Sequence, residues 1–134
     1  MLIRFQIDHL KQMQASQLIG IDLEVYNHTD GPAMTFIRDD KIVGCGGIHR
    51  LWKGVGEAWL ILGDDVFQYS VVSARHIVRL FKGMVTDFHR IQAHVLNGFD
   101  KGTQLAESIG FAHESLMKQY GPNKEDYHRY VILR

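Results

Sequence analysis

The sequence has little of what would assign it to a specialised class of protein. One cysteine in 134 residues excludes an internal disulfide and fits a reducing compartment. Fifteen basic side chains balance fifteen acidic ones, so no overall positive field exists to hold nucleic acid or an anionic membrane. No segment approaches membrane-spanning length, and the opening MLIRFQIDHL lacks the apolar run of a signal peptide. We therefore expect a soluble, cytoplasmic protein that binds neither nucleic acid nor membrane.

What is present is the composition of one globular domain. The chain is 46% hydrophobic and 22% charged, with only two prolines. Its length allows one real core but not two. Residues 1–134 are therefore predicted to form a single domain without repeats or linkers.

Hydrophobic periodicity predicts alternating strands and helices. An opening strand and a helix beginning at Asp8 precede two strands of a hairpin, over 33–38 and 41–49, and a third strand over 57–62. The glycines within the second of these strands predict a bulge or a close approach to the backbone. The longest helix is expected over 70–88, because its apolar residues recur every three or four positions. With the elements that follow, this order predicts an α/β fold with a mixed sheet.

The last third of the chain carries the most specific pattern. RIQAHVL alternates apolar and polar residues as a strand does, and Leu105 and Ile109 then recur at helical spacing. Gly110 lies where a helix ends in a left-handed residue, and Phe111 follows it directly. A two-stranded hairpin is predicted to complete the chain, with its turn at 121–123. This ending resembles the second half of the GCN5-related N-acetyltransferase superfamily.

The resemblance implies the acyl-CoA N-acyltransferase fold, a mixed, twisted sheet flanked by helices, and acetyl-CoA as cofactor. In that superfamily, a loop of pattern Gln/Arg-x-x-Gly-x-Gly/Ala at the start of the long helix cradles the pyrophosphate of coenzyme A. The matching residues here are 68–73, QYSVVS. The cofactor-binding residues that the resemblance implies are Leu62, Gln68, Ser70, Val71, Val72, Ser73 and Asn97.

The cofactor loop departs from the superfamily pattern. Gln68 fits, but Val71 occupies a glycine position, and a β-branched side chain is a poor substitute there. Asp64 and Asp65 precede the loop and would repel phosphate. Ala106 stands where many members carry a tyrosine that protonates the leaving thiolate. Two interpretations stay open, a weakened coenzyme A site and none.

Two side chains are candidates for catalysis. Glu57 opens the strand that would line the acceptor side, and related enzymes use a glutamate at about this place as the base, often through water. The alternative for Glu57 is a strand-end carboxylate in solvent or paired with a lysine. Tyr120 is the candidate general acid, with Tyr127 and Tyr130 of the same hairpin as alternatives. Such tyrosines also serve as half-buried packing residues.

Other reactive residue types do not form a predicted site. Cys45 lies between glycines and is interpreted as a small core residue, because His49 is too far along the strand to activate it. The eight histidines are scattered without ligand spacing, so no metal site is predicted.

A closer likeness within the superfamily suggests a second function. The run GEAWLILGDDVF and its non-glycine loop are similar to the internal virion protein A group of short-tailed bacteriophages, which are acetyltransferase-like and tied to virion morphogenesis. One hypothesis is an acetyl-CoA-dependent N-acetyltransferase of a small-molecule or protein amine, such as a protein N-terminus. The other is a catalytically degenerate phage protein in the host cytoplasm, which acts in virion assembly or binds a phage or host protein. A homodimer fits the superfamily, but no interface is argued from residues.

Overall fold

The computed structural model describes residues 1–13, 15, 22–27, 30–64 and 71–134. The strands are β1 (Leu2–Arg4), β2 (Ala33–Arg38), β3 (Lys41–Trp52), β4 (Val55–Leu62), β5 (Arg90–Leu96), β6 (Ala112–Met117) and β7 (Tyr127–Leu133). The helices are α1 (Asp8–Gln12), α2 (Val71–Met84) and α3 (Asp100–Ile109), with 3-10 turns η2 (Leu23–Tyr26) and η4 (Val85–Asp87). This order of strands and helices confirms the one predicted from periodicity.

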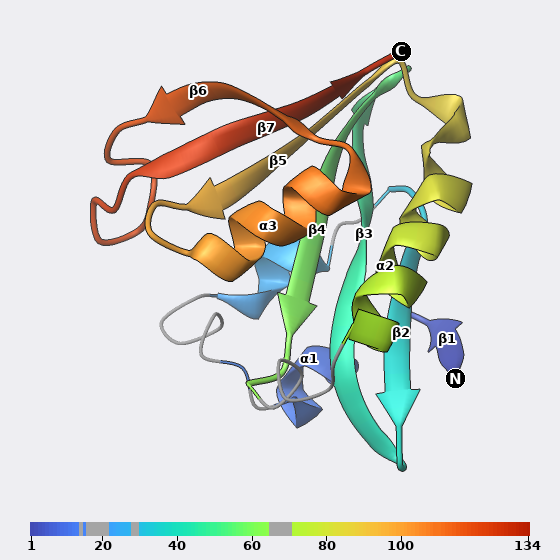
Figure 1. The fold of residues 1–134 in the computed structure, drawn as a ribbon. Coiled ribbons are helices and arrows are strands. Elements are labelled where there is room, and N and C mark those ends of the chain that lie inside the picture. The colour runs from blue at the N-terminus through green and yellow to red at the C-terminus, as the bar shows by residue number, and fades with distance from the viewer. Residues whose placement is uncertain (14, 16–21, 28–29, 65–70) are drawn as a thin grey trace.

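All the described strands belong to one twisted sheet (Figure 1). The seven strands lie in the order β1-β2-β3-β4-β5-β7-β6, and β4 and β5 are its only parallel neighbours. Parallel neighbours need a crossover, which here is α2 and η4. The predicted α/β fold with a mixed sheet is confirmed.

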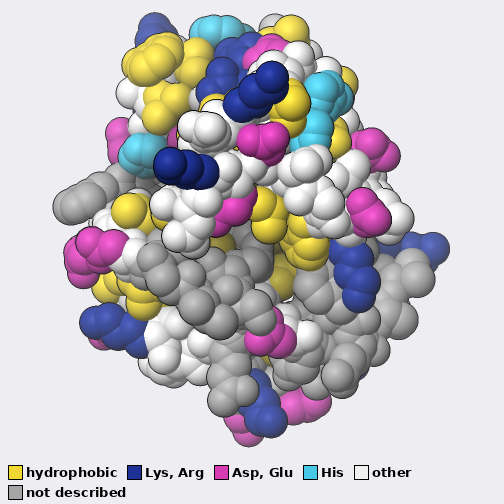
Figure 2. Space-filling model, turned by 90° about the vertical axis from the view of Figure 1, so that its left-hand side faces the viewer, with side chains coloured by type: hydrophobic (Ala, Val, Ile, Leu, Met, Phe, Trp, Pro, Cys, Tyr) yellow, Lys and Arg dark blue, Asp and Glu magenta, His cyan; other side chains and the backbone are white. Residues whose placement is uncertain are grey.

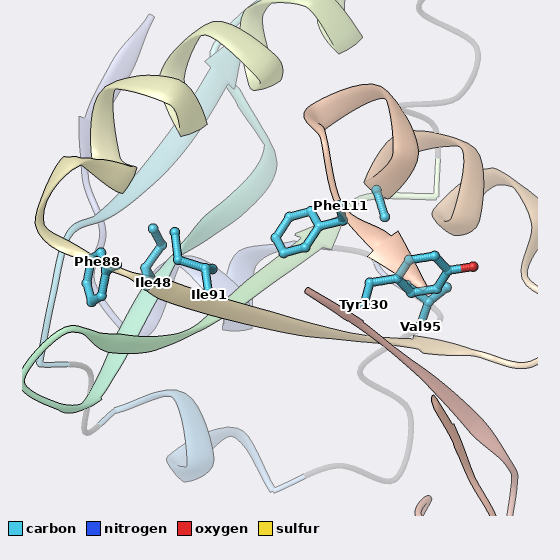
Figure 3. Close-up of a cluster of buried hydrophobic side chains, with 7 residues drawn as sticks. Ile48, Phe88, Ile91, Val95, Phe111 and Tyr130 are labelled. Carbon is cyan, nitrogen blue, oxygen red and sulfur yellow. The ribbon is translucent and has the colours of Figure 1, made fainter. Parts of the chain in front are cut away.

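Helices cover both faces of the sheet, and the two faces have separate cores. On one face, Ile48, Ile91 and Phe111 belong to a buried cluster that packs against α2 and α3 (Figure 3). On the other face, Leu10 of α1 and the partly buried Tyr26 of η2 pack with the buried Ile61. Because strand side chains alternate between faces, β3 and β4 contribute to both layers, β3 through Ile48 and Cys45 and β4 through Ala58 and Ile61.

The predicted end of α3 is confirmed in detail. Gly110 has φ 116°, a left-handed conformation that glycine adopts without strain. The N–H groups of Gly110 and Phe111 both donate to the carbonyl of Ala106. Phe111 is thereby turned back against Phe81 of α2, with ring centroids 5.4 Å apart. The Gly-Phe pair thus ends one helix and joins it to the other.

Several predicted boundaries were wrong by a few residues. Strand β3 runs on to Trp52 and β4 begins at Val55, because the hairpin continues to its tight turn. Helix α2 ends at Met84, short of the predicted Phe88, and η4 replaces its last turn. Phe88 is nonetheless buried in the core, with a side chain that is only 3% exposed. The predicted first residue of that helix, Ser70, lies outside the described residues.

The glycines of β3 permit close approach, and an irregularity in the strand pairing lies next to Gly44. Phe36 of β2 pairs with Gly44 and Ile37 pairs with Ile42, so Val43 is an extra residue of β3, while pairing is continuous from Gly44 to Gly47. A Cβ on Gly46 would lie 2.9 Å from the Leu60 side chain. A Cβ on Gly47 would strike the carbonyl oxygen of Pro32. The prediction of close approach is confirmed.

Two glycine-to-alanine substitutions, one in β3 and one in α2, should have opposite effects on stability. Gly47→Ala should lower the free energy of unfolding by about 1–3 kcal/mol, because backbone atoms block the added methyl group. Gly83→Ala, in exposed helix with no atom within 4 Å of the new Cβ, should raise it by about 1 kcal/mol. Urea unfolding measures both. A Gly47→Ala protein as stable as the parent would contradict the packing described for β3.

Candidate active site

Strands β4 and β5 begin side by side and then diverge (Figure 1). Their pairing comprises three positions, from Val55 opposite Arg90 to Glu57 opposite Gln92, although both strands continue beyond it. Helix α3 packs on both sides of the divergence. Its buried Ala106 shares a cluster with Val95 of β5, and its Leu105 packs with Leu62 of β4. The second half of β4 therefore presents a backbone edge that β5 does not pair.

Glu57 lies at the point of divergence, and alternation along β4 directs it to the α1 side of the sheet. Its neighbours two and four residues on, Trp59 and Ile61, pack in the cluster beneath α1 and η2. The intervening Leu60 packs on the helix α2 side. On β5, Val95 is buried beneath α3, so His94 points to the same side as Glu57.

Glu57, His94 and Arg129 form a hydrogen-bonded chain across three strands. His94 Nδ1 lies 2.7 Å from Glu57 Oε1, and Arg129 Nε donates to His94 Nε2 at 3.2 Å. Because the guanidinium can only donate, His94 Nε2 accepts and its proton resides on Nδ1, directed at the carboxylate. This neutral tautomer satisfies both ring nitrogens. The register of β5 and β7 places His94 directly opposite Arg129, which is why they meet.

The hydrogen bond from His94 keeps Glu57 ionised. It lowers the pKa of the carboxyl below the ordinary 4.5, against a smaller opposing effect of burial. The electrostatic interactions of Glu57 with Arg129 and with the His49 imidazole act in the same direction. Among the described residues, no hydrogen bond reaches the second carboxylate oxygen, Oε2. Glu57 is therefore an oriented carboxylate, and the lysine partner considered from the sequence is not what it pairs with.

The three hairpin tyrosines separate into two groups. Tyr120, in the connection between β6 and β7, places its ring 5.0 Å from that of His94 and 5.3 Å from that of Tyr127. Burial, and then the charge of Glu57, raises the pKa of the Tyr120 phenol, so it stays protonated at neutral pH. Tyr130 is 5% exposed in the core beneath α3, on the opposite face from Glu57 (Figure 3). The structure thus removes Tyr130 as an alternative acid.

Aromatic side chains from several elements lie on the same side of the sheet as Glu57, and we call them the aromatic arc. The aromatic arc consists of Phe5, Tyr26, Trp59, Tyr120 and Tyr127. Trp59 contacts Phe5 and Tyr26 at centroid distances of 5.0 and 5.2 Å. Burial raises the pKa of Tyr26, and the charges of Tyr127, Glu57 and Tyr120 raise it further. Figure 2 shows the left-hand side of the view in Figure 1, where hydrophobic and acidic side chains lie near one another around the centre of the face.

Sequence reasoning missed His94, Arg129 and Tyr26 as site residues. His94 had only one distinguishing signal, a titratable residue on the polar side of a strand otherwise typical of a core. Tyr26 falls in a segment without clear periodicity, which forms the short turn η2. Arg129 had no local signal, since its role depends on the register of β7 against β5.

The predicted cofactor residues are only partly brought together. Leu62 is buried at the end of β4 and packs with Ile77 of α2. Val71, Val72 and Ser73 form the first turn of α2, whose N–H groups have no partner within the helix. Gln68, Ser70 and the acidic Asp65 lie outside the described residues. Asn97 accepts a hydrogen bond from His128 Nε2 at 2.9 Å, and His128 in turn contacts His113.

Cys45 is confirmed as a core residue. It is 0% exposed, burial raises the pKa of its thiol, and it lies 3.5 Å from the hydroxyl of Thr35. Thr35 in turn contacts His9 Nδ1 at 2.7 Å, a buried polar chain that joins α1 to the sheet. Over the described part of the chain, no three metal-binding side chains gather to hold an ion, and no helix is long and apolar enough to cross a membrane.

Solved structures share this fold along the whole chain. A ribosomal-protein-alanine N-acetyltransferase from Brucella melitensis superposes with TM-score 0.76 and 15% identity, over 100% of this chain and 99% of that one. A spermidine N-acetyltransferase chimera from Vibrio cholerae and hSSAT gives 0.73 and 16%, over 99% and 95%. This chain has the GCN5-related N-acetyltransferase fold. No protein-family model matches the sequence, and no curated protein does.

The shared fold does not identify a substrate. The two matched structures act on acceptors as different as a protein alanine and a polyamine. One fold thus carries different acceptor sites, and the identities show the fold alone. The acceptor of this chain must be argued from its own side chains.

Proposed function

We propose that this chain is an acetyl-CoA-dependent N-acetyltransferase whose acceptor is an amine. The observation that carries the proposal is the Glu57 carboxylate. It is oriented by His94 and lies where β4 and β5 separate in an N-acetyltransferase fold. A fixed carboxylate attracts an ammonium and takes its proton at the place where an acyl donor would lie.

The described residues fit the extended, amide-bearing part of acetyl-CoA. The edge of β4 beyond Glu57 is not paired with β5, so its backbone groups are placed to bind amides as a neighbouring strand would. The first turn of α2, from Val71 to Ser73, offers N–H groups to an anion. When bound, acetyl-CoA supplies the acetyl group as a thioester, whose C–S bond breaks in the transfer.

The side chains then have separate tasks. Glu57 holds the acceptor ammonium and takes its proton, directly or through one water, as the amine nitrogen forms the new C–N bond. His94, held by Arg129, is a positioning residue that keeps the carboxylate in one orientation. Tyr120, whose raised pKa keeps the phenol protonated, supplies a proton to the departing sulfur. Protein N-termini are among the amine acceptors that we propose.

A second candidate is a non-catalytic protein that keeps the fold and has lost the cofactor. Three observations favour it. Val71 stands at the first turn of α2 where the superfamily has glycine, and Asp64 follows the end of β4. The short helix α3 also buries Ala106 in its core, with no hydroxyl there to act as an acid. Such a protein would bind another protein, and virion assembly in a bacteriophage is the setting we propose for it.

Calorimetric titration with acetyl-CoA near physiological salt separates the two candidates. The enzyme should bind it in the micromolar range, and Val71→Gly should bind it more tightly because the phosphates can then approach the backbone. Glu57→Gln, remote from the phosphates, should bind acetyl-CoA as well as the parent does. No heat up to millimolar acetyl-CoA, together with an unshifted melting temperature, would exclude the enzyme and favour the protein-binding candidate.

A further inference from the structure

The side chains around Glu57 combine a single oriented carboxylate with aromatic rings. The aromatic arc comprises two groups of rings in contact, Phe5 with Trp59 and Tyr26, and Tyr120 with Tyr127, and the ring of His94 lies against Tyr120. Its members come from the segment after β1, from η2, β4 and β7, and from the connection between β6 and β7. Only the folded chain assembles them, and they lie on the same side of the sheet as Glu57. Aromatic rings beside a carboxylate select one kind of ligand. The carboxylate attracts an ammonium, and the rings attract both cations and flat apolar groups.

We infer that the acceptor carries one ammonium next to an aromatic or broad apolar group. This inference rests on the proposed function and names the substrate class of the same site. The ammonium would pair with Glu57, and the attached group would pack on Tyr26 and Trp59. Two sources share this chemistry, a free arylalkylamine and a peptide whose first residue is aromatic.

The charges near Glu57 argue against a polyamine. Among the described residues, the groups that act electrostatically on Glu57 are Arg129 and the imidazoles of His94 and His49, and no acid is among them. A second ammonium would therefore meet a guanidinium near the carboxylate. The acidic side chains Glu24 and Glu125, close to the ends of the aromatic arc, accept hydrogen bonds from residues near them in sequence. Glu24 accepts from the Asn27 side chain, and Glu125 accepts from the Asn123 backbone.

The side chains of the aromatic arc are exposed enough to contact a ligand. Tyr120 is 49% exposed, while Tyr26 and Trp59 are half-buried, so the rings are fixed by packing yet still reachable. The contacts of Trp59 with Phe5 and Tyr26 order these rings before any ligand arrives. Ordered rings reduce the entropy lost on binding.

The test is calorimetric titration of the protein, without acetyl-CoA, against phenethylamine, butylamine and spermidine. Phenethylamine should bind about tenfold more tightly than butylamine, and spermidine no more tightly than butylamine. In a Trp52→Phe background, the fluorescence of Trp59 should change in parallel, because Trp52 is 65% exposed and is not part of the arc. The peptides Phe-Ala-Ala and Ala-Ala-Ala distinguish a peptide source from a free amine.

Variants of η2 provide matched controls. Tyr26→Leu should weaken phenethylamine binding about three- to tenfold, whereas Tyr26→Phe, which keeps the ring, should not. Val25→Ala, on the same turn and 65% exposed, should bind as the parent does. Equal affinity for phenethylamine and butylamine, tighter binding of spermidine, or no saturable heat with any amine would each overturn the inference. Phenethylamine binding without acetyl transfer would instead uphold the inference and contradict the proposed function.

Discussion

Replacing Glu57 by glutamine should lower the rate of acetyl transfer to an amine about 100-fold, at the low end of the range for a general base. Glutamine has the shape of glutamate, and its carbonyl can still accept from His94 Nδ1, so the geometry should survive. What is lost is the negative charge and the ability to take a proton. The low end applies because the hydrogen bond from His94 lowers the pKa of Glu57 and makes it a weaker base.

Glu114→Gln is the matched control for this experiment. Glu114 of β6 also forms an ion pair, with Arg90, and its pKa is also lowered by that partner. It contacts none of the residues of the aromatic arc among those described here, so Glu114→Gln should leave the transfer rate unchanged. Initial rates at saturating acetyl-CoA measure both variants. A Glu57→Gln protein with the parental kcat would remove Glu57 from the chemistry.

The lowered pKa of Glu57 also predicts a pH dependence. Since its pKa lies below 4.5, Glu57 remains ionised throughout the neutral range. Any fall in rate between about pH 8 and pH 5 must therefore arise from another group, such as the acceptor ammonium. A carboxyl with a lowered folded pKa stabilises the fold above 4.5, and this contribution disappears as pH falls through the folded value. The stability of the parent should therefore fall more steeply than that of Glu57→Gln as pH drops through this acidic range, while the difference between the two proteins should be constant at higher pH.

Phe111→Ala should reduce the free energy of unfolding by about 3–5 kcal/mol, the cost of removing a buried aromatic ring. Phe111 is 6% exposed and belongs to the cluster that includes Ile48, Ile91 and Tyr130 (Figure 3). Its ring also contacts Phe81 of α2, so a cavity there would remove packing between α2 and the end of α3.

Leu133→Ala is the control for the core substitution, because Leu133 is 66% exposed at the end of β7. It should change stability by no more than about 0.5 kcal/mol. Denaturant unfolding at neutral pH compares the two variants. Equal stability of Phe111→Ala and Leu133→Ala would mean that the cluster between the sheet and the helices is not packed as described.

The loss of the Phe111 ring should also alter the geometry of the candidate active site. Helix α3 packs against β5 through Ala106 and against β4 through Leu105, on either side of the place where these strands separate. A helix that is no longer held by Phe111 would leave that separation less well defined. We expect Phe111→Ala to bind acetyl-CoA more weakly even at temperatures where it remains folded.

The sequence by itself determined the elements and their order. Alternation in RIQAHVL, helical spacing of Leu105 and Ile109, and Gly110 before Phe111 are local patterns, and each reports a backbone conformation. The same local logic identified Cys45 as a core residue. It also selected Glu57 as a candidate, but only with the help of the superfamily resemblance. Boundaries were less accurate, because the ends of β3 and α2 depend on what packs against them.

Only the tertiary structure decided which side chains meet. His94 and Arg129 are 35 residues apart in sequence, and the register of β5 against β7 brings them together. The same register places Tyr127 on the side of the sheet that carries Arg129 and buries Tyr130 beneath α3, a difference that hairpin residues alone do not reveal. A shift of one residue would exchange the two faces, and with them the site and the core. Strand patterns carry the period of two but not the pairing, so the candidate site follows from how the strands are aligned.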